Sequence, residues 1–289
     1  MREVINVRLR QEKEEAVIFQ GTVPHASPQS FPLRDGAYVA ELATKALEFQ
    51  TYPGKMVPRG LPIAVDFIVA LLAIILTAPL MLIIALLIRL DSPGPVIFRQ
   101  VRIGRDRRRN HRQTARGQRN NGPEWQKSER REENILGQPF MLYKFRTMRH
   151  DGREVYPHLY NFDLKEEEIP DLYLAMSEDP RVTRVGRFLR RTSLDELPNF
   201  FNILKGDMAL VGPRPELPDV ARYYKDWQNL KFKVKPGLTG KAQISGRGFL
   251  SFEETIVYDI EYVLERSFRT DVQLLWKTVS AVVKGIGAF

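Results

Sequence analysis

The stretch IAVDFIVALLAIILTAPLMLIIALLI, residues 63–88, decides the fold of this chain. Asp66 is its only charged residue. As a straight helix the stretch would extend about 39 Å, which exceeds the roughly 30 Å of a bilayer's hydrocarbon core. A buried core helix of this length would be unusual in a protein of 289 residues. The composition therefore favours contact with a membrane.

Pro79 lies near the middle of this stretch and leaves two topologies open. Proline removes a backbone hydrogen bond and clashes with the preceding turn, so we expect a kink. A kinked helix could still span the bilayer, because membrane helices tolerate proline. Alternatively, the stretch could form a re-entrant hairpin with both ends on one side. Basic residues flank both ends, which is the charge pattern expected when both ends are cytoplasmic.

The basic charge of the chain is concentrated in one segment. The net charge is +9, and residues 99–131 alone hold twelve basic and three acidic side chains. Most of this segment is a polar, arginine-rich insertion at about 107–136, which is typical of a solvated loop. Its position after an apolar stretch favours anionic lipid as a partner. Nucleic acid is disfavoured, because no aromatic stacking platform accompanies the arginines.

The remaining residues predict a mixture of helices and strands. Residues 1–58 form an appended module, in which a strand at 5–9 precedes a helix capped by Asp35 whose apolar face needs a partner. The stretches PGPVIFRQVRIG and QPFMLYKFRTM predict a β-hairpin. Asp179 is the expected cap of a helix with an arginine-rich face. Two amphipathic helices follow, one with a capping box at Ser251 and one over about 271–284 that suits either a core or a membrane interface.

Two adjacent carboxylates, Asp195 and Glu196, lie in RRTSLDELPNFFNILKGDM, residues 190–208. Ser193 and Glu196 match the S-x-x-E pattern of a capping box, which would make the glutamate an ordinary helix-start acid. Pro198, which a helix accepts only in its first turn, moves the expected cap towards Asp195. Neighbouring residues on a helix do not share a face, so the two acids would have different environments. A structural cap and a phosphate site both remain open.

The phosphate interpretation has a definite chemistry. Backbone N–H groups at a helix start favour bound anions, and nearby cations would hold phosphate oxygens. A carboxylate can attack phosphorus as a nucleophile, and Mg²⁺ would reduce the repulsion between the two anions with a second carboxylate as its ligand. The chain lacks cysteine, which excludes thiolate nucleophiles and thiolate metal sites. The candidate clamps are Arg190, Arg191, Arg214, Lys241 and Arg247.

Four ordered motifs resemble those of the bacterial sugar transferases, the monotopic phosphoglycosyl transferases that act on undecaprenyl phosphate. They are the apolar stretch continuing into RLDSPGPVIFRQVRIG, then FMLYKFRTM, then VGRFLRRTSLDELPNFFNILKGDMALVGPRPELP, and finally VKPGLTGKAQISGRG. The resemblance covers about residues 59–285. Two departures are Ala78, where the family often has serine, and the insertion at about 107–136.

The resemblance implies a reaction and a set of site residues. Such enzymes move a sugar 1-phosphate from a UDP-sugar to a polyprenyl phosphate and release UMP, the first membrane step of surface polysaccharide assembly. Asp195 matches the nucleophile and Glu196 the acid associated with Mg²⁺. Pro79 matches the break of a re-entrant membrane helix, which favours the hairpin over the spanning helix. The residues expected to bind phosphate or substrate are Lys144, Arg190, Arg214, Lys241, Arg247 and Asp259.

We therefore predict an α+β protein with a membrane-embedded re-entrant helical hairpin, amphipathic interfacial helices and a small cytoplasmic catalytic domain that contains a β-hairpin. The expected boundaries are 1–58 for the appended module, 59–90 for the membrane helix and 91–289 for the catalytic domain. The expected location is the cytoplasmic (inner) membrane, with the active site facing the cytoplasm. The sequence names neither the sugar nor the pathway, and it leaves a homo-oligomer open. A non-catalytic membrane-anchored protein is the alternative.

Overall fold

The structure is a computed structural model that describes residues 4–9, 17–22, 35–51, 56–106, 137–160, 179–246 and 250–284. The arginine-rich insertion predicted at about 107–136 lies outside the described residues. The elements are β1 (Val4–Leu9), β2 (Val17–Thr22), α1 (Gly36–Thr51), α2 (Ile63–Asp91), β3 (Ile97–Ile103), β4 (Pro139–Phe145), α4 (Gly152–Val155), η1 (Pro157–Tyr160), α5 (Arg184–Thr192), η3 (Leu194–Glu196), α6 (Asn199–Leu204), β5 (Ala209–Val211), α7 (Pro218–Ala221), η4 (Asp226–Lys233), β6 (Gly237–Thr239), α8 (Lys241–Gly246), α9 (Phe252–Glu265) and α10 (Phe268–Lys284).

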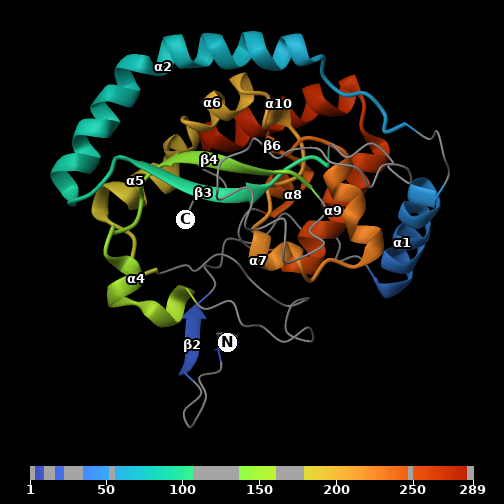
Figure 1. Cartoon of the computed structure of the whole chain (residues 1–289), viewed down its shortest axis with the longest axis horizontal. Coiled ribbons are helices and arrows are strands. Elements are labelled where there is room, and N and C mark those ends of the chain that lie inside the picture. Colours follow the sequence, from blue (N-terminus) through green and yellow to red (C-terminus); the bar gives the residue numbers. More distant parts are fainter. Residues whose placement is uncertain are drawn as a thin grey trace, which may run out of the picture.

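The apolar stretch forms one long helix, α2, which is bent over the rest of the molecule (Figure 1). Pro79 lies inside it, and a bend is what an internal proline predicts. We predicted a hairpin broken at Pro79, but α2 continues without interruption from Ile63 to Asp91. The re-entrant insertion therefore remains a prediction. Among the described helices, α2 is the one long and apolar enough to cross a membrane.

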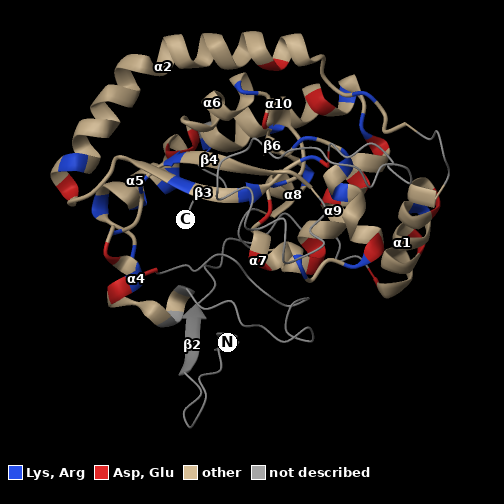
Figure 2. Ribbon diagram, viewed as in Figure 1, with Lys and Arg blue, Asp and Glu red and all other residues tan. Residues whose placement is uncertain are grey.

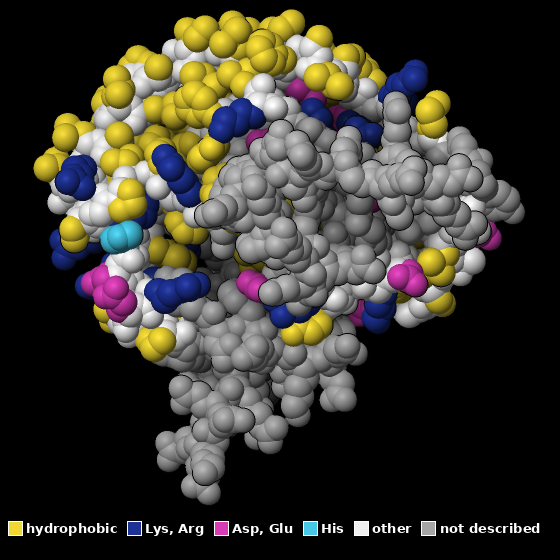
Figure 3. Space-filling view, in the orientation of Figure 1, with side chains coloured by type: hydrophobic (Ala, Val, Ile, Leu, Met, Phe, Trp, Pro, Cys, Tyr) yellow, Lys and Arg dark blue, Asp and Glu magenta, His cyan; other side chains and the backbone are white. Residues whose placement is uncertain are grey.

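Most of the apolar side chains of α2 are exposed. Figure 3 shows a continuous hydrophobic band over the top and left of the molecule, where α2 runs. Four residues of α2 are buried, two towards each end: Asp66, Ala70, Ile84 and Ile88. Both ends of α2 thus pack on the same set of elements, β3 to α10, which we call the body. The exposed apolar surface between them has no counterpart in a water-soluble helix, because such surfaces mark an interaction with lipid or protein.

Small sheets and short helices build the body. β3 and β4 pair antiparallel, with Ile97 opposite Phe145 and Ile103 opposite Pro139, which confirms the predicted hairpin. β5 and β6 pair parallel. The predicted capping box at Ser251 is present, since Ser251 accepts from the backbone N–H of Glu254 and Glu254 accepts from that of Ser251. The buried face of α9 that follows belongs to the main hydrophobic core.

The helix α1 of the N-terminal module packs on this core. Leu42 and Ala46 are buried in the same cluster as Trp227 and Ile260, and Asp35 accepts a hydrogen bond from the backbone of Tyr38 as predicted. The apolar face of α1 therefore has the body as its partner rather than a membrane surface. The strand predicted at 5–9 is β1, which pairs antiparallel with β2.

Most of the apolar stripe of α10 is exposed rather than in the core, and contact of this stripe with a membrane interface stays a prediction. Phe268, Val272, Trp276 and Val279 recur on one face, and Trp276 is 76% exposed. In Figure 1, α10 lies below α2 and close to α6. The helix begins at Phe268, three residues before the expected start at Asp271. Leu274 points the opposite way and is buried in the core.

Candidate active site

The two adjacent carboxylates lie in a single turn between two helices. Asp195 and Glu196 belong to η3, which follows α5 and precedes α6. The expected capping box is absent: Ser193 has a left-handed backbone, with φ 58°, and ends α5, its N–H bonding to the carbonyl of Arg190. We expected a phosphate site at a helix start. Because α6 has only six residues, its helix dipole contributes little to such a site. The turn itself, with flanking cations, is the more important feature.

Lys144 at the end of β4 contacts the second carboxylate of this pair. Its Nζ lies 2.8 Å from Oε1 of Glu196, and both side chains are about a quarter exposed. Ion pairs at this degree of exposure are open to solvent and to exchange with another anion. The structure therefore brings together two residues that are 52 positions apart in the chain and that the sequence assigned to the same site.

Two predicted clamps directly precede the turn: Arg191 is exposed, whereas Arg190 is directed back into the protein. Its Nε donates to Oγ1 of Thr147 at 3.0 Å. Burial lowers the pKa of its guanidinium, while the carboxylates of Asp179 and Asp195 oppose that effect. The charge of Arg190 thus lies within electrostatic reach of Asp195, which is itself buried. A nearby guanidinium favours the charged form of a carboxylate, which is the form that a nucleophile on phosphorus requires.

The stretch Lys144–Thr147 connects the acid pair to the long apolar helix α2. Phe145 packs in a buried cluster with Ile84 and Ile88 of α2. Arg146 donates to the carbonyl of Ser92 at 2.7 Å and also to that of Pro93, so it binds backbone oxygens just after α2 ends. A cation at a helix C-terminus satisfies carbonyls that lack intrahelical partners. Four consecutive residues thus link Glu196, α2 and Arg190.

Asn202 of α6 fixes the turn against the β-hairpin. Its side-chain amide donates to the carbonyl of Met141 at 2.7 Å, and its side-chain oxygen accepts from the backbone N–H of Tyr143 at 3.0 Å. A residue in a neighbouring parallel strand would bond to the same two groups, the carbonyl of Met141 and the N–H of Tyr143. The side-chain amide of Asn202 therefore occupies the free edge of β4. Asn202 is fully buried, and β4 continues directly to Lys144. The sequence analysis missed this residue, because an asparagine inside a helical pattern carries no signal for a strand edge.

A second ionic cluster lies behind Arg214. Lys231 Nζ is 3.0 Å from Glu216 Oε2 and 3.0 Å from Asp259 Oδ2, and the hydroxyl of Tyr224 donates to Glu216 at 2.6 Å. All three charged side chains are buried. Asp259, which we predicted as a substrate-binding acid, is fully buried, and its carboxylate lies against Lys231. Sequence reasoning missed Glu216, Tyr224 and Lys231.

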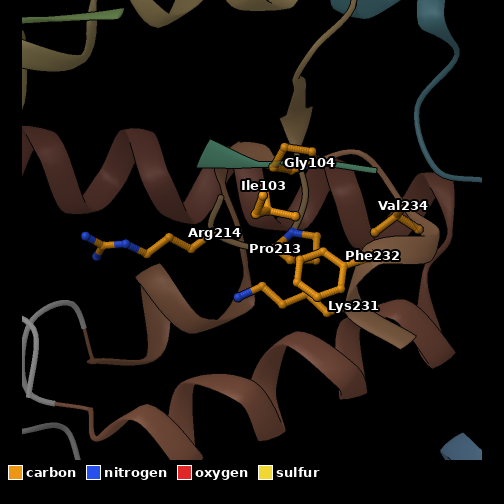
Figure 4. A pocket seen from close by; sticks show the side chains of 8 residues that line it. Ile103, Gly104, Pro213, Arg214, Lys231, Phe232 and Val234 are labelled. Atoms are coloured by element: carbon orange, nitrogen blue, oxygen red, sulfur yellow. The ribbon is translucent and has the colours of Figure 1, made fainter. Parts of the chain in front are cut away.

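Arg214 stands at the mouth of a small cavity in front of this cluster. The cavity is lined by Ile103, Gly104, Pro213, Arg214, Lys231, Phe232, Val234 and Pro236, and the charged ends of Arg214 and Lys231 extend the same way from it (Figure 4). Arg102 donates to the carbonyl of Pro215, which holds the loop next to Arg214. Burial, together with the nearby charge of Arg214, lowers the pKa of Arg102 to about 10, although Glu216 opposes the shift. An exposed arginine on a loop fixed by buried charges suits anion binding.

The remaining predicted residues are placed elsewhere or are not described. Lys241 forms ion pairs with Glu261 and Glu265 of α9, at 2.8 and 2.9 Å, and Glu261 also accepts from the hydroxyl of Tyr38 in α1. Lys241 is therefore engaged between α8, α9 and α1 rather than with the acid pair. Arg247 lies outside the described residues. Asp179, the expected cap of α5, instead binds Arg181, and Thr183 caps the helix by accepting from Gly186.

Comparison with known proteins places the chain. Residues 59–116 and 115–285 match the family described as bacterial sugar transferase. The chain belongs to the bacterial sugar transferase family. The chain and the galactosyl transferase CpsE of Streptococcus agalactiae are 32% identical over 246 residues, which is 85% of this chain and 46% of the relative. The chain and the UDP-glucose:undecaprenyl-phosphate glucose-1-phosphate transferase of Escherichia coli are 36% identical over 231 residues, 77% and 40% of the two chains.

A shorter relative matches this bacterial sugar transferase along most of both lengths. The exopolysaccharide production protein ExoY of Rhizobium meliloti is 33% identical over 224 residues, which is 78% of this chain and 86% of ExoY. The chain spans about half the length of the first curated relatives that it matches.

The cavity cluster of this bacterial sugar transferase predicts a specific pH dependence. Burial raises the pKa of Asp259 to about 6, Lys231 opposes the rise and Glu216 adds to it. The native state therefore binds this proton more tightly than the unfolded state, whose carboxyl titrates near 4. The contribution of Asp259 to stability is present below pH about 4 and is lost as the pH rises through about 6.

We expect Asp259→Asn to remove this dependence. At pH 4 the variant and the wild type melt at similar temperatures, because both carry an uncharged side chain at position 259. The melting temperature of the variant relative to the wild type then rises with pH and becomes constant above about pH 6. Thermal unfolding of both proteins in the same detergent across this range measures the difference. A constant difference at all pH values would contradict the raised pKa.

Proposed function

We propose that this bacterial sugar transferase moves a sugar 1-phosphate from a UDP-sugar to a polyprenyl (undecaprenyl) phosphate and releases UMP. One observation carries the proposal: Asp195 and Glu196 occupy one turn, with Lys144 on one acid, Arg190 beside the other and the end of α2 directly behind them. The relative in Escherichia coli that shares 36% of its matched residues is named a glucose-1-phosphate transferase acting on undecaprenyl phosphate. The chain is shorter than that relative, and the sugar remains open.

The reaction proceeds in two steps. An oxygen of the Asp195 carboxylate attacks the sugar-bearing phosphorus of the UDP-sugar, and the bond from that phosphorus to the UMP oxygen breaks. UMP leaves with the bonding electrons, and the phosphosugar remains on Asp195 as an acyl phosphate. An oxygen of the polyprenyl phosphate then attacks the same phosphorus, the bond to Asp195 breaks, and the carboxylate is regenerated.

The cations around the turn have separate tasks. Arg190 supplies positive charge near Asp195, while Lys144 alternates between Glu196 and a phosphate oxygen of the donor. Arg214 holds an oxygen of the nucleotide phosphates from its loop in front of Lys231. Such clamps stabilise charge that develops in the transition state.

The acid pair fits Mg²⁺ that is shared with the substrate. Among the described residues no group of three or more His, Cys, Asp or Glu side chains could hold a metal ion. Mg²⁺ often takes only one or two carboxylates and completes its coordination with water and substrate phosphates, and this donor set matches that pattern. Glu196 would be the protein ligand, and the ion would neutralise charge on the donor phosphates.

The location that we propose is the cytoplasmic membrane, with α2 inserted from one side as a re-entrant helix. Asp66 near its start accepts from the backbone of Leu210 at 3.0 Å, and Asp91 at its end accepts from that of Val185 at 3.2 Å. A straight helix of 29 residues would be about 43 Å long and would carry its ends to opposite faces of the bilayer. Fastening both ends to one body supports insertion and return on the same side. The exposed stripe of α10 suits contact with the head-group region.

The test of the function is release of UMP. Purified protein in nanodiscs is given Mg²⁺, a polyprenyl phosphate and a panel of UDP-sugars, and UMP and glycolipid are measured together. We expect one donor to give both products in equal amounts. If no donor in the panel gives UMP, a non-catalytic membrane-anchored protein becomes the better interpretation.

Topology makes a separate prediction. The chain has no cysteine, so Met56→Cys and Arg105→Cys each introduce a single reactive thiol, one on either side of α2. A membrane-impermeant maleimide should label both in inside-out vesicles and neither in intact spheroplasts. Because both positions are exposed, lack of labelling reports sidedness rather than burial. Labelling of the two positions from opposite sides would establish a spanning helix and contradict re-entrant insertion.

Asn202 is predicted to position the acid pair. Asn202→Leu removes both hydrogen bonds to β4, so the turn moves relative to Lys144, and a displacement of about 1 Å can cost roughly a hundredfold in rate. We expect kcat to fall about ten- to a hundredfold with a smaller change in KM. A double-mutant cycle with Lys144→Met identifies the route, because the Asn202 effect should largely disappear once Lys144 is gone. Full additivity of the two losses would show that Asn202 acts by general stability instead.

A further inference from the structure

The outer face of α5 carries a row of basic residues that the proposed reaction does not use. This nine-residue helix has four arginines and no acidic residue. Arg190 turns inward to Thr147, whereas Arg184, Arg187 and Arg191 are exposed along one face. Within the described part of the chain, none of these three forms an ion pair, in contrast to Arg181, which binds Asp179.

The opposite face of α5 is fixed to the end of the membrane helix. Leu189 and Val185 pack with Ile84 and Ile88 of α2 in one cluster. The carboxylate of Asp91 accepts the backbone N–H of Val185, which satisfies one of the free N–H groups at the start of α5. The position of the basic face relative to α2 is therefore set by packing and by a hydrogen bond.

The close approach of α5 to β4 depends on a glycine. A Cβ at Gly186 would lie 2.0 Å from the carbonyl oxygen of Thr147, so only glycine permits the contact. The side of α5 at Gly186 thus lies against the backbone of Thr147, and the three arginines lie on the opposite, exposed side. Figure 2 shows basic residues on α5 beside the lower left end of α2, whose middle carries no charge.

An aromatic residue accompanies the arginines. Phe188 lies on the same side of α5 and is 56% exposed, and Phe98 and Arg99 of β3 are exposed close to where α2 ends. Arginine with phenylalanine on one helix face is typical of helices that lie at a membrane interface, where the ring enters the acyl boundary and the guanidinium reaches phosphate. A soluble acidic protein would need no such ring next to an apolar helix end.

We propose that the α5 face formed by Arg184, Arg187, Phe188 and Arg191 binds the phosphates of anionic phospholipids in the leaflet that α2 enters. The other side of α5 packs on the end of α2, so a bilayer that accepts α2 brings its head groups close to this helix. The proposal rests on membrane insertion of α2 but not on the reaction. Each basic residue close to an anionic surface contributes roughly fivefold in partitioning, and salt screens the effect.

The test compares two lipids at one labelled site. Leu90→Cys, at an exposed position one residue before Asp91, is labelled with bimane and the protein is reconstituted into vesicles. Quenching is measured with phosphatidylglycerol and with phosphatidylcholine that carry the same nitroxide near the head group. We expect phosphatidylglycerol to be preferred about fivefold or more, and the preference to weaken as ionic strength rises.

The arginines are tested by Arg184→Gln, Arg187→Gln and Arg191→Gln together, which should bring the ratio of the two lipids close to one. The matched control replaces Arg222, Lys225 and Lys233 with glutamine. These basic residues follow α7 or end η4. In Figure 1, α7 lies across the body from α2. The control should keep the preference. Melting temperatures of both triple variants confirm folding.

Two results would overturn the proposal. The first is a wild type that shows no preference for phosphatidylglycerol, and the second is a preference that survives in the arginine variant. Quenching by neither lipid would show that α2 is outside the bilayer, and it would overturn the insertion together with the lipid site. UMP release is measured on the same vesicles, so a failure of the enzymatic proposal is seen separately.

Discussion

Replacing Asp195 with asparagine is expected to abolish transfer, with a loss of at least a thousandfold in kcat. The amide cannot form the acyl phosphate, because its nitrogen and carbonyl oxygen are far weaker nucleophiles than a carboxylate oxygen. The side chain keeps its size and its buried position in η3, so folding and membrane association should remain. Steady-state UMP release with the preferred donor measures the loss.

A single-turnover experiment distinguishes a nucleophile from a residue that only assists. Without a lipid acceptor, the wild type should release about one equivalent of UMP and retain labelled sugar on the protein. The asparagine variant should show neither. Glu196→Gln provides the comparison, because loss of a metal ligand should raise the Mg²⁺ concentration needed for half-maximal rate while the covalent adduct still forms. Asp219→Asn, at an exposed position on α7, is the neutral control.

Two outcomes would change the assignment of the acid pair. Full turnover in the Asp195 variant would remove it as the nucleophile. A covalent adduct in that variant together with none in Glu196→Gln would exchange the two roles. The structure makes these outcomes separable, since Lys144 contacts Glu196 whereas Arg190 acts on Asp195.

Lys231→Met is expected to destabilise the protein by about 3–5 kcal/mol. Lys231 is the shared cation of Glu216 and Asp259, and its removal leaves two buried carboxylates without a compensating charge. For a chain of this size the loss corresponds to a fall of about 10 °C in melting temperature. The loop that carries Arg214 should also become less ordered. Glu216, two residues after Arg214, forms a backbone bridge with Ile103 that fixes this loop.

The physical cause is tested by removing the charges together. In the triple variant Lys231→Met, Glu216→Gln and Asp259→Asn, no buried charge remains, and most of the lost stability should return. Lys233→Met, two residues along η4 and half-buried, should change the stability by no more than about 0.5 kcal/mol. If the triple variant is no more stable than Lys231→Met alone, lost packing of the lysine stem explains the effect and the charge argument fails.

Local pattern sufficed for several parts of this bacterial sugar transferase. The length and apolarity of residues 63–88 predicted a long helical segment, and proline chemistry predicted its bend. The expected break at Pro79 is absent, because α2 continues from Ile63 to Asp91. Strand alternation and turn residues predicted the pairing of β3 with β4, and the S-x-x-E pattern at Ser251 predicted its cap. These features depend on neighbours within a few positions, so the sequence contains all the information they need.

The same S-x-x-E pattern at Ser193 failed, and the reason is tertiary. Gly186 lets α5 lie directly on Thr147, and the chain must then reverse towards α6, so Ser193 takes a left-handed conformation and ends one helix instead of starting another. Likewise Thr183, rather than Asp179, caps α5, because Asp179 is engaged by Arg181. A capping motif shows which hydrogen bonds a side chain can form. The other contacts of that residue in the folded chain decide which of these bonds it forms.

By itself the sequence determined a long apolar helix, and it predicted the residues for chemistry on a phosphate: an Asp-Glu pair and several cations. Only the tertiary structure decided which of these act together. Lys144 meets Glu196 because Asn202 fixes α6 to the edge of β4, Lys241 is engaged by α9 and α1, and Asp259 is sealed behind Lys231. Pairings between residues 50 or more positions apart depend on burial and on the geometry of the whole chain, and no local pattern carries that information.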